Sequence, residues 1–113
     1  MGISIRAAKA KGRRLQNKVR DLLRAAFPKL EEDDIKSQTM GMSGEDIVMS
    51  PLAKKKIKYS FECKNKERLD LWASLAQAED NCENRVPVLV FKRNNSKTYV
   101  AFELDHFIDL IQE

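Results

Sequence analysis

Three charged residues in the middle of the chain have the types and the spacing of a catalytic site. Glu62 and Lys64 stand one residue apart in the segment SFECKNKE, and Asp46 precedes Glu62 by 16 residues in GMSGEDIV. Side chains in a β-strand alternate between its two faces. Glu62 and Lys64 would therefore share one face of a strand over residues 57–64. The non-catalytic alternative is a cross-strand ion pair on a solvated strand face.

The two carboxylates have a chemical use if they converge. Carboxylate oxygens a few ångströms apart repel each other unless a cation lies between them. Mg²⁺ suits such a site, because it takes hard oxygen ligands, few protein carboxylates, several waters and a substrate phosphate. The metal would polarise a phosphodiester and lower the pKa of a bound water. Lys64 would orient the attacking water or stabilise the charge that develops on the phosphate.

Apolar periodicity indicates the elements that must position these residues. Residues 7–27 predict a helix ended by Pro28, with an apolar stripe formed by Leu15, Val19, Leu22, Leu23 and Ala26. Short strands are expected over residues 35–40 and, after a turn with glycines, over 46–49. Residues 51–56 predict a lysine-rich loop. We expect the strands from 46 and 57 to pair as a hairpin across that loop, which would place Asp46 beside Glu62.

The second half of the chain predicts one helix, a strand hairpin and a closing helix. The helix over residues 67–82 has an apolar stripe that places Trp72 in the core, and strands 87–92 and 98–103 follow. His106, in the closing helix, is expected to be structural. The order α-β-β-β-α-β-β-α predicts an α/β fold with a mixed central β-sheet flanked by helices. A chain of 113 residues predicts one domain over residues 1–113.

Positive charge is concentrated at the N-terminus. Nine of the 21 Lys and Arg residues lie in residues 1–30 against a single acid, Asp21, and a second basic cluster, KKKIK, occupies residues 54–58. Segregated positive charge suits a polyanion, although a solvated helix face and a lysine-rich loop would look the same. The absence of an apolar signal segment and the two cysteines without metal-ligand spacing favour the cytoplasm.

The segments GEDIV and YSFECK resemble the D…ExK core of the PD-(D/E)xK nuclease superfamily, which has the restriction-endonuclease-like fold. The nearest resemblance is to small Holliday-junction-resolvase-like and phage-encoded nucleases. It extends over the basic helix KGRRLQNKVRDLL, the GMSGEDIV turn and strand, the ExK strand and the following helix with QAE. The resemblance implies a restriction-endonuclease-like core.

The resemblance also implies roles for individual residues. Asp46 and Glu62 would bind Mg²⁺, for which Mn²⁺ would substitute, together with the backbone carbonyl of Cys63. Lys64 would be the catalytic lysine, and Ser43 and Gln77 would lie in the active site. Gln16 stands where many resolvase-like members have a metal-linked Glu, and Glu45 could compensate, although strand alternation points it away from Asp46. The residues expected to contact DNA are Lys11, Arg13, Arg14, Arg20, Arg24, Lys54, Lys55 and Lys56.

The resulting hypothesis is a Mg²⁺-dependent DNA endonuclease, structure-selective in the manner of a Holliday-junction resolvase and acting in DNA recombination, repair or phage DNA processing. We expect a homodimer, because two incisions on different strands need two active sites. One alternative is a nucleic-acid-binding module that keeps the nuclease fold with weak or no catalysis. Another is an assembly protein whose basic helix binds an acidic partner.

Overall fold

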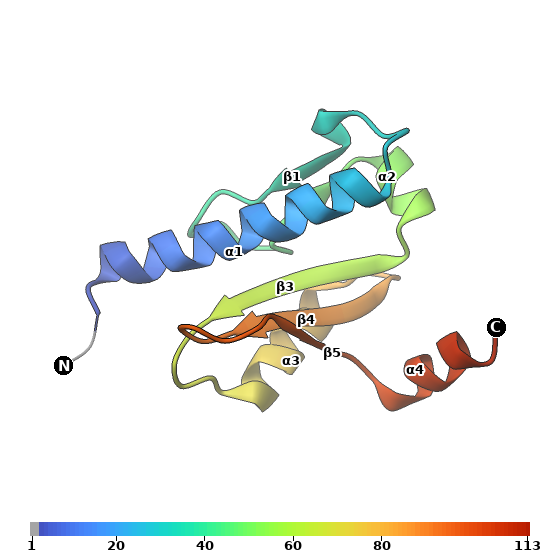
Figure 1. Ribbon diagram of the computed structural model, residues 1–113. Helices are drawn as coiled ribbons and strands as arrows, with labels where there is room; N and C mark the ends of the chain where they lie inside the picture. The colour runs from blue at the N-terminus through green and yellow to red at the C-terminus, as the bar shows by residue number, and fades with distance from the viewer. Residues whose placement is uncertain (1–2) are drawn as a thin grey trace.

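The computed structural model describes residues 3–113, and Figure 1 shows the arrangement of their helices and strands. In chain order the elements are α1 (Ile5–Ala26), a 3₁₀ turn η1 (Glu32–Asp34), β1 (Ile35–Ser37), β2 (Ile47–Met49), α2 (Pro51–Lys56), β3 (Tyr59–Asn65), α3 (Leu71–Asn81), β4 (Val86–Lys92), β5 (Tyr99–Ala101) and α4 (Leu104–Ile111). The predicted α/β class and element order are confirmed, with one additional short helix, α2.

The strands form two sheets rather than one. β1 and β2 pair antiparallel, and a separate sheet has the order β3-β4-β5, with β3 and β4 parallel and β4 and β5 antiparallel. The expected hairpin between the strands at 46 and 57 is therefore wrong. The lysine-rich segment folds as α2 instead of a loop, because the Ser50 side chain caps the Ala53 N–H and Pro51 occupies the first turn.

α1 lies across both sheets and carries the predicted apolar stripe (Figure 1). Its first turn is capped by the Ser4 hydroxyl, which accepts a hydrogen bond from the Ala7 N–H. Leu15 and Val19 are buried against a core that draws on both sheets and α2, and its other members are Ile35, Ile47, Met49, Ala53, Ile57, Cys63, Val88 and Val90. This core fixes the two sheets relative to each other.

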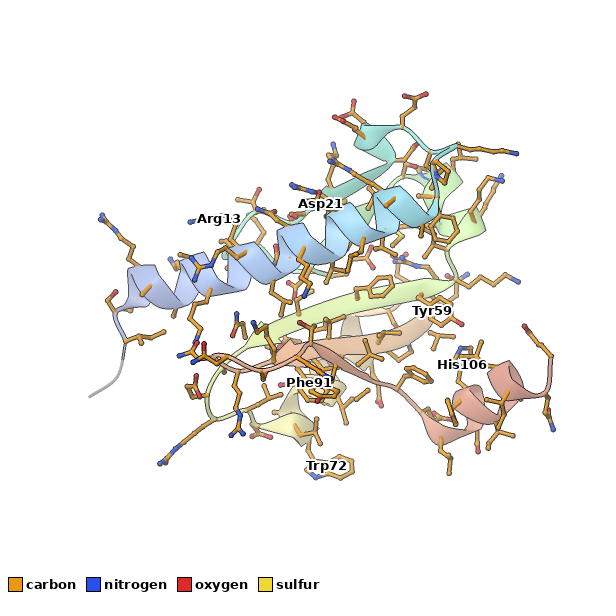
Figure 2. All side chains as sticks on the ribbon, in the orientation of Figure 1. Arg13, Asp21, Tyr59, Trp72, Phe91 and His106 are labelled. Atoms are coloured by element: carbon orange, nitrogen blue, oxygen red, sulfur yellow. The ribbon has the colours of Figure 1, made fainter. Side chains whose placement is uncertain are left out.

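The predicted buried face of α3 is wrong. Trp72 is 79% exposed and projects from the helix into solvent (Figure 2), whereas Ser74 and Ala78 are buried. These two residues are one turn apart, so they share the face that packs on β3 and β4. Small side chains on that face allow the helix to approach the sheet closely. The apolar pattern of the sequence did not indicate this face, because its large apolar residues lie on another one.

The C-terminal helix α4 has no buried residue. His106 lies between Tyr59 and Phe102, and its Nε2 is 2.7 Å from the Tyr59 hydroxyl, so the histidine has the expected structural role (Figure 2). The apolar side chains of Leu104, Phe107 and Ile111 remain exposed. Across residues 3–113, no helix is long and apolar enough to span a bilayer.

Candidate active site

Asp46 is bound to the free edge of β3. Its N–H donates to the carbonyl of Phe61 (3.1 Å), and its Oδ2 accepts from the N–H of Cys63 (2.6 Å). β3 is the outer strand of its sheet, so the backbone groups of Phe61 and Cys63 on the side away from β4 have no strand partner. The turn before Asp46 depends on Gly41 and Gly44, which have φ of 87° and 100°.

Glu62 is buried under α3, with 2% of its surface exposed. Its Oε2 lies 3.8 Å from the Nζ of Lys64, on the same face of β3 as the sequence predicts. Its Oε1 lies 3.5 Å from the Nδ2 of Asn81, which also approaches the carbonyl of Gly44 at 3.3 Å. Asn81 therefore links the glycine turn to the buried carboxyl group. Sequence reasoning missed this residue, since it comes from the last turn of a helix with no motif of its own.

The carboxyl groups of Asp46 and Glu62 interact directly. Burial and, second to it, the charge of Asp46 raise the pKa of Glu62 to about 7, against the opposing charge of Lys64. Burial also raises the pKa of Asp46, whereas hydrogen bonds from the Cys63 N–H and from Glu62 lower it. Without a cation, this pair therefore retains a proton near neutral pH. The side chains from GEDIV and YSFECK meet as the sequence predicts, although no hairpin joins them.

The oxygen ligands of this site fit Mg²⁺. In a strand the N–H and C=O of one residue point to the same side, so the Cys63 carbonyl faces the same edge as Asp46. Burial raises the pKa of the Cys63 thiol, which leaves its sulfur neutral and favours the carbonyl as the ligand. No three His, Cys, Asp or Glu side chains cluster as a metal site within residues 3–113. Two carboxylates with neutral oxygens and waters are a set that Mg²⁺ accepts.

Gln16 has a buried side-chain amide. It lies on the buried face of α1, with 5% of its surface exposed, and its Oε1 is buried without a hydrogen-bond partner. A buried amide oxygen without a partner destabilises the fold unless a cation or a water binds it. The position predicted to replace a first-helix Glu therefore has an unpartnered amide oxygen, and its part in the cation site remains a prediction.

Glu45 does not compensate for Gln16. Its Oε2 lies 2.6 Å from the Nη2 of Arg85 and accepts from the Ser60 hydroxyl at 2.7 Å. Arg85 is itself buried and also donates to the carbonyl of Tyr59 and to Glu83. Strand alternation points Glu45 away from Asp46, as expected, and into an ion pair that joins the segment before β2 to β3 and β4. Sequence reasoning did not identify Arg85.

The pKa of Glu62 predicts how the metal-free protein responds to pH. A carboxyl group whose pKa is higher in the folded than in the unfolded state adds stability that is complete below its unfolded pKa of about 4.5 and is lost as the pH rises through about 7. Between pH 4.5 and 8, the unfolding free energy of wild type should fall relative to that of Glu62→Gln by about 1–3 kcal/mol. Urea unfolding in a chelator measures the difference.

The comparison with Glu62→Gln cancels the contributions of carboxylates outside the site. The pKa values of the Asp21, Asp34 and Glu83 carboxyl groups are lowered, chiefly by side-chain hydrogen bonds from Arg20, Ser50 and Lys54 respectively. These three groups therefore make the folded state more stable as the pH rises, and they do so equally in wild type and in Glu62→Gln. Parallel pH profiles for the two proteins would contradict the assignment to Glu62. Adding Mg²⁺ at pH 8 should recover the lost stability in wild type alone.

Ser43 and Gln77 are solvent-exposed and remain predictions. Ser43 lies in the glycine turn, where its carbonyl accepts from the Nε2 of Gln38. Gln77 is one turn before Asn81 on α3, so the two share a helix face. Within residues 3–113, neither side chain forms a hydrogen bond to protein, which leaves both free to contact a ligand.

The basic residues predicted to bind DNA fall into four groups. Arg24 donates to the carbonyls of Ile35 and Glu32, and Arg20 pairs with Asp21, so both have structural contacts. Lys54, Lys55 and Lys56 lie in α2 near the start of β3, whereas Lys64 is near its end. Arg13 is exposed, and Figure 2 shows it on the side of α1 away from β3. Lys11 and Arg14 line a cavity beside the end of β3.

Comparison with known proteins gives one match. A family model described as "Phage putative PDDEXK endonuclease" matches residues 7–113, which is nearly the whole chain. Searches of curated proteins and of solved structures returned no match. The matched range includes Asp46, Glu62 and Lys64, together with the basic face of α1.

Proposed function

Because the chain belongs to the phage PDDEXK endonuclease family, we propose that it is a Mg²⁺-dependent endonuclease that hydrolyses phosphodiester bonds in DNA. The observation that carries the proposal is the interacting carboxyl pair of Asp46 and Glu62, with Lys64 at 3.8 Å from Glu62. The pair is partly desolvated, retains a proton without a cation, and includes Asp46 at the strand edge that the Cys63 carbonyl faces. A protein that used Glu62 and Lys64 only as an ion pair would not need Asp46 in contact with Glu62.

Each residue has a distinct part in the proposed reaction. Asp46, Glu62 and the Cys63 carbonyl would hold Mg²⁺, which when bound supplies a Lewis acid for the scissile phosphate and lowers the pKa of a water. Asn81 fixes the Glu62 carboxylate, and the Cys63 N–H fixes that of Asp46. Lys64, 20% exposed, has its ammonium group free to reach the phosphate and stabilise the developing negative charge.

The test of this proposal is cleavage of a labelled panel of DNA structures. Four-way junction, nicked duplex, flap and plain duplex would be incubated with the protein in Mg²⁺, in Mn²⁺ and in Ca²⁺. We expect cleavage in Mg²⁺ and Mn²⁺, and binding without turnover in Ca²⁺. A preference for the four-way junction would support a resolvase role in recombination, repair or phage DNA processing within the host cytoplasm. Binding in all three metals without any cleavage would instead support the non-catalytic module.

We also propose that the protein works as a two-fold homodimer through its C-terminal apolar surface. β5 exposes Tyr99 and Val100, and α4, which follows directly, exposes Leu104, Phe107 and Ile111. A second copy is the fitting occupant, because two sites related by a two-fold axis would cut both strands of a symmetric substrate. Sedimentation at micromolar concentration should give a dimer, and Phe107→Glu should give a monomer.

The control for the dimer is Leu52→Glu, which adds the same charge at another exposed apolar residue on α2. This variant should remain dimeric. A wild-type species near 13 kDa, with nicks and no paired cuts in the products, would overturn the dimer and leave a monomeric nickase.

A further inference from the structure

A basic cavity lies on the far side of β3 from the buried carboxyl of Glu62. Its volume is about 540 Å³, and it is bounded by α1, the last residue of β3 and the turn between β4 and β5. Figure 1 shows the first half of α1 passing over the end of β3 and the β4–β5 turn at the same end of the sheet. Residues from three separate segments of the chain therefore meet there.

Four cations line this cavity. Lys11, Arg14 and Lys18 are three and four residues apart on α1, so the helix places them on one face, and Lys92 comes from the end of β4. Arg13, Arg20 and Arg24 follow a different spacing and fall on another face of the same helix. The sequence shows one continuous basic segment, whereas the fold divides it into two surfaces.

The charge of the cavity is not neutralised by the protein. Within residues 3–113, none of the four cations is within ion-pair distance of a carboxylate, and no acidic residue lines the cavity. The Nζ of Lys18 has a neutral partner, the Thr98 hydroxyl at 3.3 Å. Lys11 is only 8% exposed, which is unusual for a lysine without a carboxylate partner. Like charges held together lower stability, and a bound anion would relieve that cost.

Asn65 ties the cavity to the strand that carries Glu62 and Lys64. It is the last residue of β3 and directly follows Lys64, and its Nδ2 approaches the carbonyl of Lys11 at 3.5 Å, which ties α1 to the strand end. Its Oδ1 is buried without a partner. This oxygen can only accept a hydrogen bond, so it would bind a lysine ammonium or a water rather than the anion itself.

We propose that this cavity binds a phosphate group of the DNA other than the one that is cleaved. The inference rests on the proposed function, since it takes the substrate to be DNA. A phosphate held by the four cations would set the register of the strand, while Asp46, Glu62 and Lys64 act on the scissile phosphate from the edge and the opposite face of the same strand, β3. The chemistry is that of a phosphate oxygen bound by ammonium and guanidinium groups. An internal phosphodiester and a terminal phosphate both offer such oxygens.

The experiment measures DNA affinity without cleavage, in Ca²⁺, at several salt concentrations. The test variant is Lys18→Gln/Lys92→Gln. The control is Lys29→Gln/Lys36→Gln, which removes the same charge from two exposed lysines, one after the end of α1 and one on β1. We expect the test variant to bind about tenfold more weakly and its salt slope to fall by about one relative to the control. Lys18→Arg/Lys92→Arg should bind as wild type does, because it keeps both positive charges.

The outcomes separate this proposal from the proposed function. If wild type binds no DNA, the proposed function fails and the cavity proposal fails with it. If wild type binds and cleaves DNA, and the test and control variants have the same affinity and salt slope, only the cavity proposal is overturned. Circular dichroism of both variants verifies the fold.

The same assay distinguishes the two sources of the phosphate. Closed circular duplex, linear duplex with 5′-hydroxyl ends and linear duplex with 5′-phosphate ends would each be tested. An equal loss of affinity on all three identifies an internal phosphodiester. A loss confined to the 5′-phosphorylated duplex identifies a terminal phosphate, and either result supports a phosphate in the cavity.

Discussion

Replacing Asp46, Glu62 or Lys64 by alanine is expected to reduce the rate of DNA cleavage in Mg²⁺ by at least about a thousandfold. Charge stabilisation by a bound metal contributes several kcal/mol to such reactions, and each 1.4 kcal/mol is a factor of ten in rate. Among residues 3–113, Asp46 and Glu62 are the only two carboxylates of the proposed cation site, because Glu45 forms an ion pair with Arg85. Single-turnover rates on a labelled duplex measure the effect.

The variants must be compared with folded controls of similar chemistry. Asp46→Asn and Glu62→Gln keep the size of each side chain, and the Asn oxygen can still accept from the Cys63 N–H. Asp80→Ala and Lys66→Ala remove exposed charges on α3 and after β3, and should retain cleavage. A folded Glu62→Gln, Asp46→Asn or Lys64→Ala protein that cleaves at the wild-type rate would refute the assignment.

Replacing Arg85 by alanine is expected to lower the free energy of unfolding by about 3–5 kcal/mol. The Arg85 and Glu45 side chains are 4% and 10% exposed, and their ion pair is 2.6 Å long. Removing the guanidinium leaves the Glu45 carboxylate buried with one hydroxyl donor, Ser60. It also removes the donor to the Tyr59 carbonyl. Urea unfolding measures the change.

The Lys54–Glu83 pair provides the matched control. Its side chains are 36% and 60% exposed, so Lys54→Ala should cost no more than about 1 kcal/mol. The double variant Glu45→Gln/Arg85→Met should be less destabilised than the sum of its single changes, because it leaves no buried charge. Equal losses of unfolding free energy for Arg85→Ala and Lys54→Ala would show that the buried pair stabilises the fold no more than the exposed pair does.

The sequence predicted those parts of the site that depend on local rules. Strand alternation placed Glu62 and Lys64 on one face and Glu45 away from Asp46, and both placements are found. Asn81 and Arg85 could not be predicted, because Asn81 contacts Glu62 19 positions away, Arg85 contacts Glu45 40 positions away, and neither belongs to a local pattern. The prediction that Trp72 is buried was wrong because α3 packs on the sheet through small side chains, which contribute little to a hydrophobic pattern.

The capping of the β3 edge by Asp46 has a consequence for solubility. An outer strand with unpaired N–H and C=O groups can pair with a strand of another molecule, which leads to aggregation. Asp46 occupies two of these groups, the Phe61 carbonyl and the Cys63 N–H, through its own N–H and its carboxylate. The residue proposed to bind the cation therefore also protects an open sheet edge, so loss of its carboxylate would expose a surface on which chains can associate.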